Sequence, residues 1–219
     1  MKQHTLFVVV LVGLLLAFIV GRQFYTTSQD ERATAAAPAP LGMLERPHSP
    51  SLGPANAPVV IVEFFDPACE TCAVFYPMVK ELMAANSDKI RLVLRYAPFH
   101  NGSDMVVAAL EASRRQDKFW PTLEALLTTQ GSWAPNHTSQ MGLAWPHIEG
   151  LGLDLAQMRA DMMTPEITRV IAQDLEDARA LNVTKTPEYF VNGKPLPSFG
   201  YAQLRALVDE ALRASERRP

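Results

Sequence analysis

The chain has 219 residues, of which 48% are hydrophobic and 20% charged, and its formal net charge is −3 at pH 7. This is the composition of an ordinary globular protein rather than a disordered one, and the length suits one domain with an appendage. Basic and acidic residues are mixed throughout, so no basic block indicates a nucleic-acid-binding protein.

The first 25 residues predict a membrane segment. Residues 6–20, LFVVVLVGLLLAFIV, carry no charge and follow Lys2. The small-residue sites that a signal peptidase needs lie at residues 33–37, too far beyond this run for ordinary cleavage. A transmembrane helix needs about 20 residues, and Arg22 can extend its side chain toward the lipid headgroups. We therefore predict an uncleaved signal-anchor at residues 1–25, single-pass in the inner membrane, with the remaining chain in the periplasm. A cleaved signal, the alternative, would release the chain into the periplasm.

Residues 26–51 are rich in Ala, Pro, Ser and Thr and show little apolar periodicity. Such a composition is typical of a flexible tether. We therefore predict a linker at 26–51, a folded domain at 52–214 and a short tail at 215–219.

A short and almost wholly apolar run opens the domain. Residues 59–65, VVIVEFF, predict a strand that is buried on both faces. The single charge in this run, Glu63, is then expected to be buried as well. A helix is expected over residues 69–83, with a kink at Pro77, and a second strand begins at Ile90.

The rest of the domain is mainly helical. Residues 103–181 form a long helical block, and Asn192-Gly193 then lies between two extended runs, which is a strong hairpin signal. An amphipathic helix is expected over residues 201–214. The order strand, helix, strand, helical block, hairpin, helix predicts an α/β fold with a helical insertion.

Cys69 and Cys72 are the only cysteines, and four kinds of chemistry compete for the pair. Covalent haem needs a histidine directly after the second cysteine, but residue 73 is Ala. A structural zinc ion needs four ligands, and the five histidines show no convincing ligand spacing. An inert disulfide across so small a loop would remove little entropy from the unfolded chain. A redox couple explains the spacing better.

On the redox interpretation, Cys69 lies at the start of a helix, where unpaired N–H groups and the helix dipole stabilise a thiolate. Cys72 lies one turn further on, close enough to attack a mixed disulfide. We predict that Cys69 is the nucleophile and Cys72 the resolving thiol. Glu63, six residues earlier, is expected to exchange a proton with Cys72 if it is buried. A strand-edge carboxylate facing water is the alternative for Glu63.

Two segments resemble the DsbA-like class of thioredoxin-fold proteins. They are GPANAPVVIVEFFDPACETC at residues 53–72 and VTKTPEYFVNGKPL at residues 183–196. The resemblance implies a thioredoxin-like fold with a helical insertion, and thiol–disulfide exchange with exported proteins. It also implies that Pro187 is cis and, with Thr186, holds an extended substrate near Cys69. A redox-recycling partner protein is implied, and no cofactor.

The dipeptide between the cysteines departs from the family pattern. Strongly oxidising members carry Pro-His there, whereas this chain has Glu70-Thr71. A neighbouring carboxylate disfavours a thiolate, so we expect a less oxidising couple. The sequence leaves open whether the protein is an oxidase or a reductase or isomerase.

Two other functional classes remain open. A membrane-tethered Cu(I)-binding or copper-delivery module would use the same pair of thiolates, because soft sulfur ligands suit Cu(I). A peptide-binding domain without catalysis would keep the fold and lose the exchange chemistry.

Overall fold

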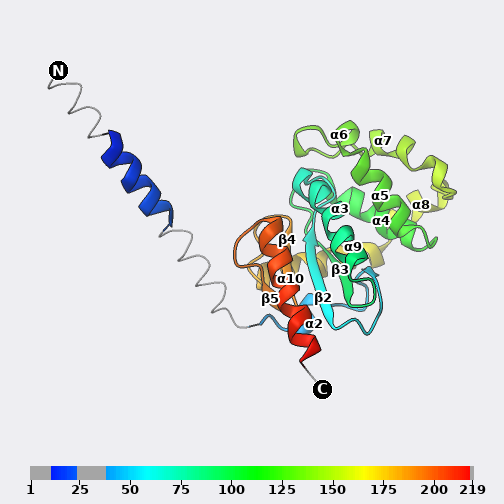
Figure 1. Cartoon of the computed structure of the whole chain (residues 1–219). Coiled ribbons are helices and arrows are strands. Elements are labelled where there is room, and N and C mark those ends of the chain that lie inside the picture. Colours follow the sequence, from blue (N-terminus) through cyan, green and yellow to red (C-terminus); the bar gives the residue numbers. More distant parts are fainter. Residues whose placement is uncertain (1–10, 24–37, 218–219) are drawn as a thin grey trace.

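The computed structural model describes residues 11–23 and 38–217 (Figure 1). Residues 11–23 form a helix, and within the described ranges no helix combines the length and the apolar character needed to cross a bilayer. Residues 1–10 and 24–25 of the predicted anchor lie outside the described residues, as does 26–37 of the predicted linker.

A five-stranded sheet forms the centre of the domain. Its strands lie in the order β1-β3-β2-β4-β5, with β2 and β3 parallel and the other pairs antiparallel. Their bounds are β1 Ser51–Leu52, β2 Val59–Phe65, β3 Ile90–Tyr96, β4 Glu188–Val191 and β5 Lys194–Pro195. The central strand β2 occupies the residues predicted for it and is buried on both faces, which confirms that prediction.

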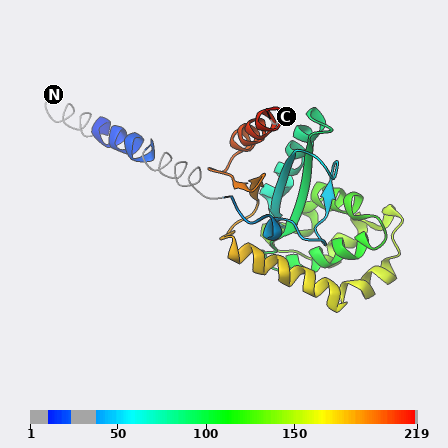
Figure 2. The same ribbon diagram turned by 90° about the horizontal axis from the view of Figure 1, so that it is seen from below.

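The two faces of β2 contact different parts of the chain because successive side chains point to opposite sides. Ile61 and Phe65 belong to the main core, with residues of α3, Glu70–Ala85, and α10, Tyr201–Glu216. Phe64 belongs to a smaller core that includes residues of α2 and α9. Figure 2 shows α9 and α10 on opposite sides of the strands.

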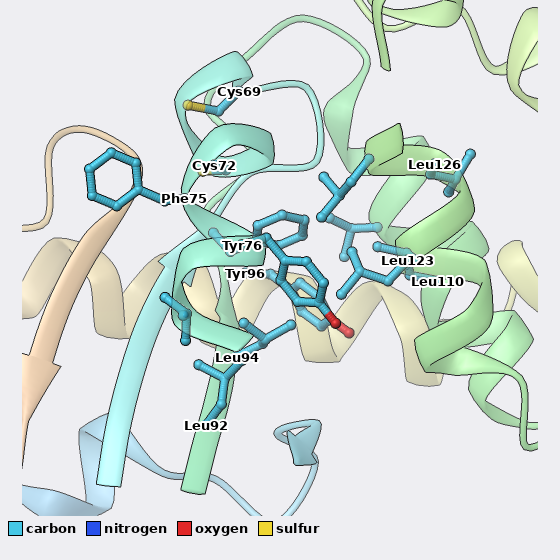
Figure 3. Close-up of a cluster of buried hydrophobic side chains, with 14 of the residues drawn as sticks. Cys69, Cys72, Phe75, Tyr76, Leu92, Leu94, Tyr96, Leu110, Leu123 and Leu126 are labelled. Atoms are coloured by element: carbon cyan, nitrogen blue, oxygen red, sulfur yellow. The ribbon is translucent and has the colours of Figure 1, made fainter. Parts of the chain in front are cut away.

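The helical insertion follows β3 and rejoins the sheet at β4. Its central helix α4 contacts α5, α8 and α9. Figure 3 shows how leucines of the insertion meet Tyr76 of α3 and Tyr96 of β3 in one continuous core. The insertion comprises α4 Ser103–Arg114, α5 Phe119–Thr128, α6 Gln130–Trp133, α7 Met141–Ala144, α8 Leu155–Met162 and α9 Pro165–Ala180, with 3-10 turns at Pro135–His137, Trp145–His147 and Glu149–Leu151.

Residues 38–50 are packed onto the domain, unlike the tether predicted for them. This N-terminal arm contains the short helix α2, Leu41–Leu44, whose Leu44 is fully buried. Arg46 makes two hydrogen bonds to Asp177 of α9, at 2.8 and 2.7 Å. The folded unit therefore begins at least as early as residue 38, not near residue 52. One buried leucine and a distant ion pair leave no periodicity that the sequence could reveal.

Candidate active site

The turn after β2 places Cys69 at the cap of α3. Its backbone is extended, with φ −77° and ψ 113°, and its N–H donates to the carbonyl of Asp66 at 3.0 Å. Cys72 lies one turn further along the same helix, and both are free thiols (Figure 3). The predicted helix thus begins one residue later than expected, with Cys69 as the capping residue rather than the first helical one.

The segment before β4 lies directly against Cys69. When protonated, the Sγ of Cys69 donates to the carbonyl oxygen of Thr186 at 3.2 Å. The peptide bond between Thr186 and Pro187 is cis. The hydroxyl of Thr186 is buried and has no hydrogen-bond partner among the described residues. The structure therefore brings the second family segment next to the cysteines, and the roles of its two residues stay predictions.

The two thiols differ sharply in acidity. A hydrogen bond from the Cys72 thiol is the main reason that the pKa of Cys69 is lowered to about 5, although burial opposes it. The hydroxyl of Thr186, which can donate once the sulfur is ionised, and the N–H groups of Cys72 and Thr71 lower the pKa further. Burial raises the pKa of Cys72 well above its usual value, and the hydrogen bond to Cys69 adds to this. At neutral pH the outer sulfur is a thiolate and the inner one a thiol.

Glu63 is fully buried, as its apolar neighbours predict. Burial is the main cause that raises the pKa of Glu63 to about 8. Tyr189, its partner on the neighbouring strand β4, lowers this pKa, and the charge of Cys69 raises it further. Neither carboxyl oxygen has a hydrogen-bond partner among the described residues. The charge of Glu63 contributes to the raised pKa of Cys72, so the two groups interact electrostatically.

Asp66 is a site residue whose importance the sequence did not reveal. Its carboxylate is fully buried and accepts hydrogen bonds from the N–H of Ala68 at 2.8 Å and from the hydroxyl of Ser103. The backbone N–H and the Nδ1 of His100 lie 2.9 and 2.7 Å from its other oxygen. This carboxylate joins the active-site turn to the loop that opens the insertion. An Asp-Pro pair after a strand is the only sequence signal for it.

Gln130 approaches the same turn from the insertion. Its Nε2 donates to the carbonyls of Pro67 at 2.6 Å and Cys69 at 3.1 Å. A glutamine within a helical block carries no sequence signal for such a contact.

Aromatic side chains lie beside the cysteines on α3. Phe75 stacks with Tyr189 at a centroid distance of 6.1 Å and lies tilted against Phe199 at 4.8 Å. Phe199 is 44% exposed, and the Nζ of Lys185 lies 6.0 Å from its ring. Figure 3 shows Phe75 on the opposite side of α3 from Tyr76. These rings give the site an apolar border.

The described part of the site offers few ligands for a metal ion. Across residues 11–23 and 38–217, no three His, Cys, Asp or Glu side chains are grouped so that they could hold a metal ion. The two sulfurs therefore stand as a pair without a third ligand of these types in the described structure.

Comparison with known proteins points to one family. The family model described as thioredoxin matches residues 45–210. The chain is 31% identical to a thioredoxin-like oxidoreductase from Silicibacter pomeroyi DSS-3, with a TM-score of 0.69 over 80% of this chain and 99% of that one. It superimposes on oxidised BdbD from Bacillus subtilis with a TM-score of 0.66, at 22% identity, over 76% and 94% of the two chains.

The curated relatives are longer proteins. The chain is 30% identical to the Na(+)/H(+) antiporter NhaA of Herminiimonas arsenicoxydans over 95% of its own length. It spans about a third of that antiporter, since the match covers 33% of it.

Proposed function

The chain belongs to the thioredoxin family. We propose that it is a thiol:disulfide oxidoreductase of the DsbA-like kind, which exchanges disulfides with exported proteins through Cys69 and Cys72. One observation carries this proposal. The Cys69 sulfur lies at a helix cap where a neighbouring thiol and two backbone N–H groups lower its pKa to about 5. A thiolate at neutral pH is the form that attacks disulfides.

The exchange begins with the Cys69 thiolate. It attacks one sulfur of a substrate disulfide, forms a mixed disulfide, and expels the other substrate sulfur as a thiolate. Cys72 then loses its proton and attacks the Sγ of Cys69, which releases the second substrate thiolate and leaves an enzyme disulfide. In reverse, a substrate dithiol is oxidised and the enzyme is reduced.

The direction that the geometry favours is substrate oxidation. A stabilised thiolate at Cys69 stabilises the reduced enzyme, and it also makes this sulfur a good leaving group. The enzyme disulfide is then consumed as substrates are oxidised, so a redox partner must reoxidise it. No cofactor enters this cycle.

Glu63 is proposed to accept the proton of Cys72 and to return it. A pKa of about 8 lets a carboxyl exchange protons near neutral pH. No hydrogen bond joins the carboxyl to Cys72 in the described structure, so the transfer is proposed to run through a water molecule.

Thr186 and Pro187 are proposed to bind the substrate backbone. The carbonyl of Thr186 lies 3.2 Å from the reacting sulfur, so a chain joined to Cys69 must pass beside it. The exposed ring of Phe199 is placed to contact an apolar side chain of the same substrate.

We further propose that the N-terminal segment attaches the domain to the inner membrane, on its periplasmic side. The support is the uncharged run at residues 6–20 and the exposure of apolar side chains in helix 11–23, such as Leu14 at 67% and Phe18 at 71%. Carbonate extraction of membranes tests the attachment: a protein that is released into the soluble fraction does not carry an anchor.

The function is tested by insulin reduction and by oxidation of a reduced model substrate. Wild-type protein should catalyse both, Cys69→Ala neither, and Cys72→Ala should accumulate mixed disulfides. Copper handling, the competing proposal, predicts no catalysis and a stoichiometric amount of Cu(I) retained through purification, lost in both variants.

A further inference from the structure

The turn that carries Cys69 is held by a side chain of the helical insertion. Gln130 is the first residue of α6 and is 5% exposed. Its amide nitrogen has two hydrogens, and the two bonds end on the carbonyls of Pro67 and Cys69. Both N–H hydrogens of this buried amide therefore bind the active-site turn.

These two bonds fix the peptide groups that follow Pro67 and Cys69. Pro67 has no N–H of its own with which to bind a neighbour. The carbonyl of Cys69 also accepts the first helical hydrogen bond, from the N–H of Ala73 at 3.2 Å. Gln130 thus holds Cys69 in the extended cap conformation while α3 begins immediately after it.

We propose that Gln130 is a positioning residue for the exchange reaction, because it holds the Cys69 sulfur where the N–H groups of Thr71 and Cys72 converge. This proposal rests on the proposed role of Cys69 as the nucleophile. Gln130 touches carbonyl oxygens and not the sulfur, so it acts on the thiolate through the backbone. The helical insertion then contributes to the chemistry of the cysteines as well as to the fold.

A purely structural role is the competing account. A buried carbonyl that loses its partner destabilises the fold wherever it lies. That account predicts a lower melting temperature and an unchanged nucleophile. The positioning account predicts that the ionisation of Cys69 and the equilibrium with glutathione change in the folded protein.

The test replaces the amide by an apolar side chain of similar length, Gln130→Met. We expect the pH midpoint of Cys69 alkylation to rise by about one unit. The equilibrium constant with glutathione should shift about tenfold toward a less oxidising couple, which is about 30 mV. The matched control is Gln116→Met, because Gln116 also binds two backbone groups within the insertion, those of Asp154, at 3.1 and 2.8 Å. The control should leave both quantities unchanged.

The inference is overturned if Gln130→Met is folded and neither the ionisation constant of Cys69 nor the equilibrium constant with glutathione changes by more than twofold. The melting temperature of the variant does not affect this conclusion. If Gln130→Met does not fold, Gln130→Asn takes its place, since a side chain one methylene shorter cannot reach both carbonyls, and the same two measurements decide. If Cys69 is acidic and active in wild type and its ionisation does not change in the variant, only the role of Gln130 is rejected. A wild-type protein without catalysis rejects the proposed function itself.

Discussion

The sulfur of Cys69 lies 3.2 Å from the carbonyl oxygen of Thr186, although 117 positions separate the two residues. The sheet causes this meeting. The strands β2 and β4 are antiparallel, with Phe64 opposite Glu188, so the end of one strand lies beside the start of the other. The turn after β2 and the segment before β4 therefore leave the sheet at the same edge. That edge is where the nucleophile and its proposed substrate-binding residues come together.

The first prediction concerns the hydroxyl of Thr186. The carbonyl of this residue accepts from the Cys69 thiol, but the hydroxyl has no partner among the described residues and can donate once the sulfur ionises. Thr186→Val should therefore raise the pKa of Cys69 by about one unit, followed by the ultraviolet absorbance of the thiolate. Thr184→Val, an exposed position in the same segment, is the control. Equal profiles for the two variants would contradict the contribution of the hydroxyl.

The second prediction is that the two cysteines react at very different pH. Cys69, with a pKa of about 5, should reach half of its maximal alkylation rate near pH 5. Cys72, whose pKa burial raises well above its usual value, should remain unmodified through neutral pH. Peptide mass spectrometry after a brief iodoacetamide pulse at pH 6 should find the label on Cys69 alone. Equal labelling of both residues would show that their sulfurs do not differ as described.

The third prediction is an intermediate redox potential. Thiolate pKa values of about 3.5 and about 7 accompany potentials of about −120 and about −270 mV in DsbA and thioredoxin. A pKa of about 5 for Cys69 places this couple between them, at about −200 mV. The pKa of Cys69 is lowered from 9.0 to about 5. Measured against glutathione, the reduced form therefore gains stability over the oxidised form as pH rises from about 5 to 9, and this gain is lost as pH falls back to about 5. Equilibration with glutathione at several pH values measures both effects.

The local parts of this fold were predictable because their signals are local. The apolar run in β2 predicts a buried strand, and the flanking residues predict that Glu63 is buried with it. The position of Cys69 at a helix start follows from the turn residues before it. The roles of Thr186 and Pro187 depend on the family resemblance, since nothing in their own composition places them beside a cysteine.

Other parts depend on contacts between distant residues and left no pattern. Gln130 reaches the active-site turn from 61 positions away, and an isolated glutamine looks like any polar residue of a helix. The Asp-Pro pair after the strand is the only sequence sign of Asp66, yet its carboxylate accepts three hydrogen bonds and lies 2.7 Å from the Nδ1 of His100. The two-residue strand β1 is too short for any alternation to be visible.

The fourth prediction concerns the buried carboxyl of Glu63. Its pKa is raised from 4.5 to about 8, so between these values the unfolded chain is ionised while the folded protein keeps the proton. Unfolding then releases a proton, and stability should fall as pH rises through this range, by up to about 1.4 kcal/mol per pH unit. Glu63→Gln should remove this contribution and gain stability relative to wild type as pH increases.

Urea denaturation of the oxidised proteins at pH 5 and pH 8 measures the difference, because the thiols do not titrate in that form. Burial, the largest cause of the shift, does not depend on the charge of the thiols. A wild-type protein that is no less stable relative to Glu63→Gln at pH 8 than at pH 5 would mean that the carboxyl is already ionised in the folded state.

The fifth prediction tests whether the N-terminal arm belongs to the folded domain. The short helix α2 begins with Leu41, which is 64% exposed, and ends with Leu44, which is fully buried against β2 and β3 residues such as Val62 and Val93. Leu44→Ala should lower the free energy of unfolding by about 2–5 kcal/mol, the cost of a cavity in a core. Leu41→Ala, in the same helix, should change it by less than about 0.5 kcal/mol. If both substitutions change the free energy of unfolding by similarly small amounts, residues 38–50 act as a tether. A cavity in a segment that is not part of the cooperative fold does not lower the stability of that fold.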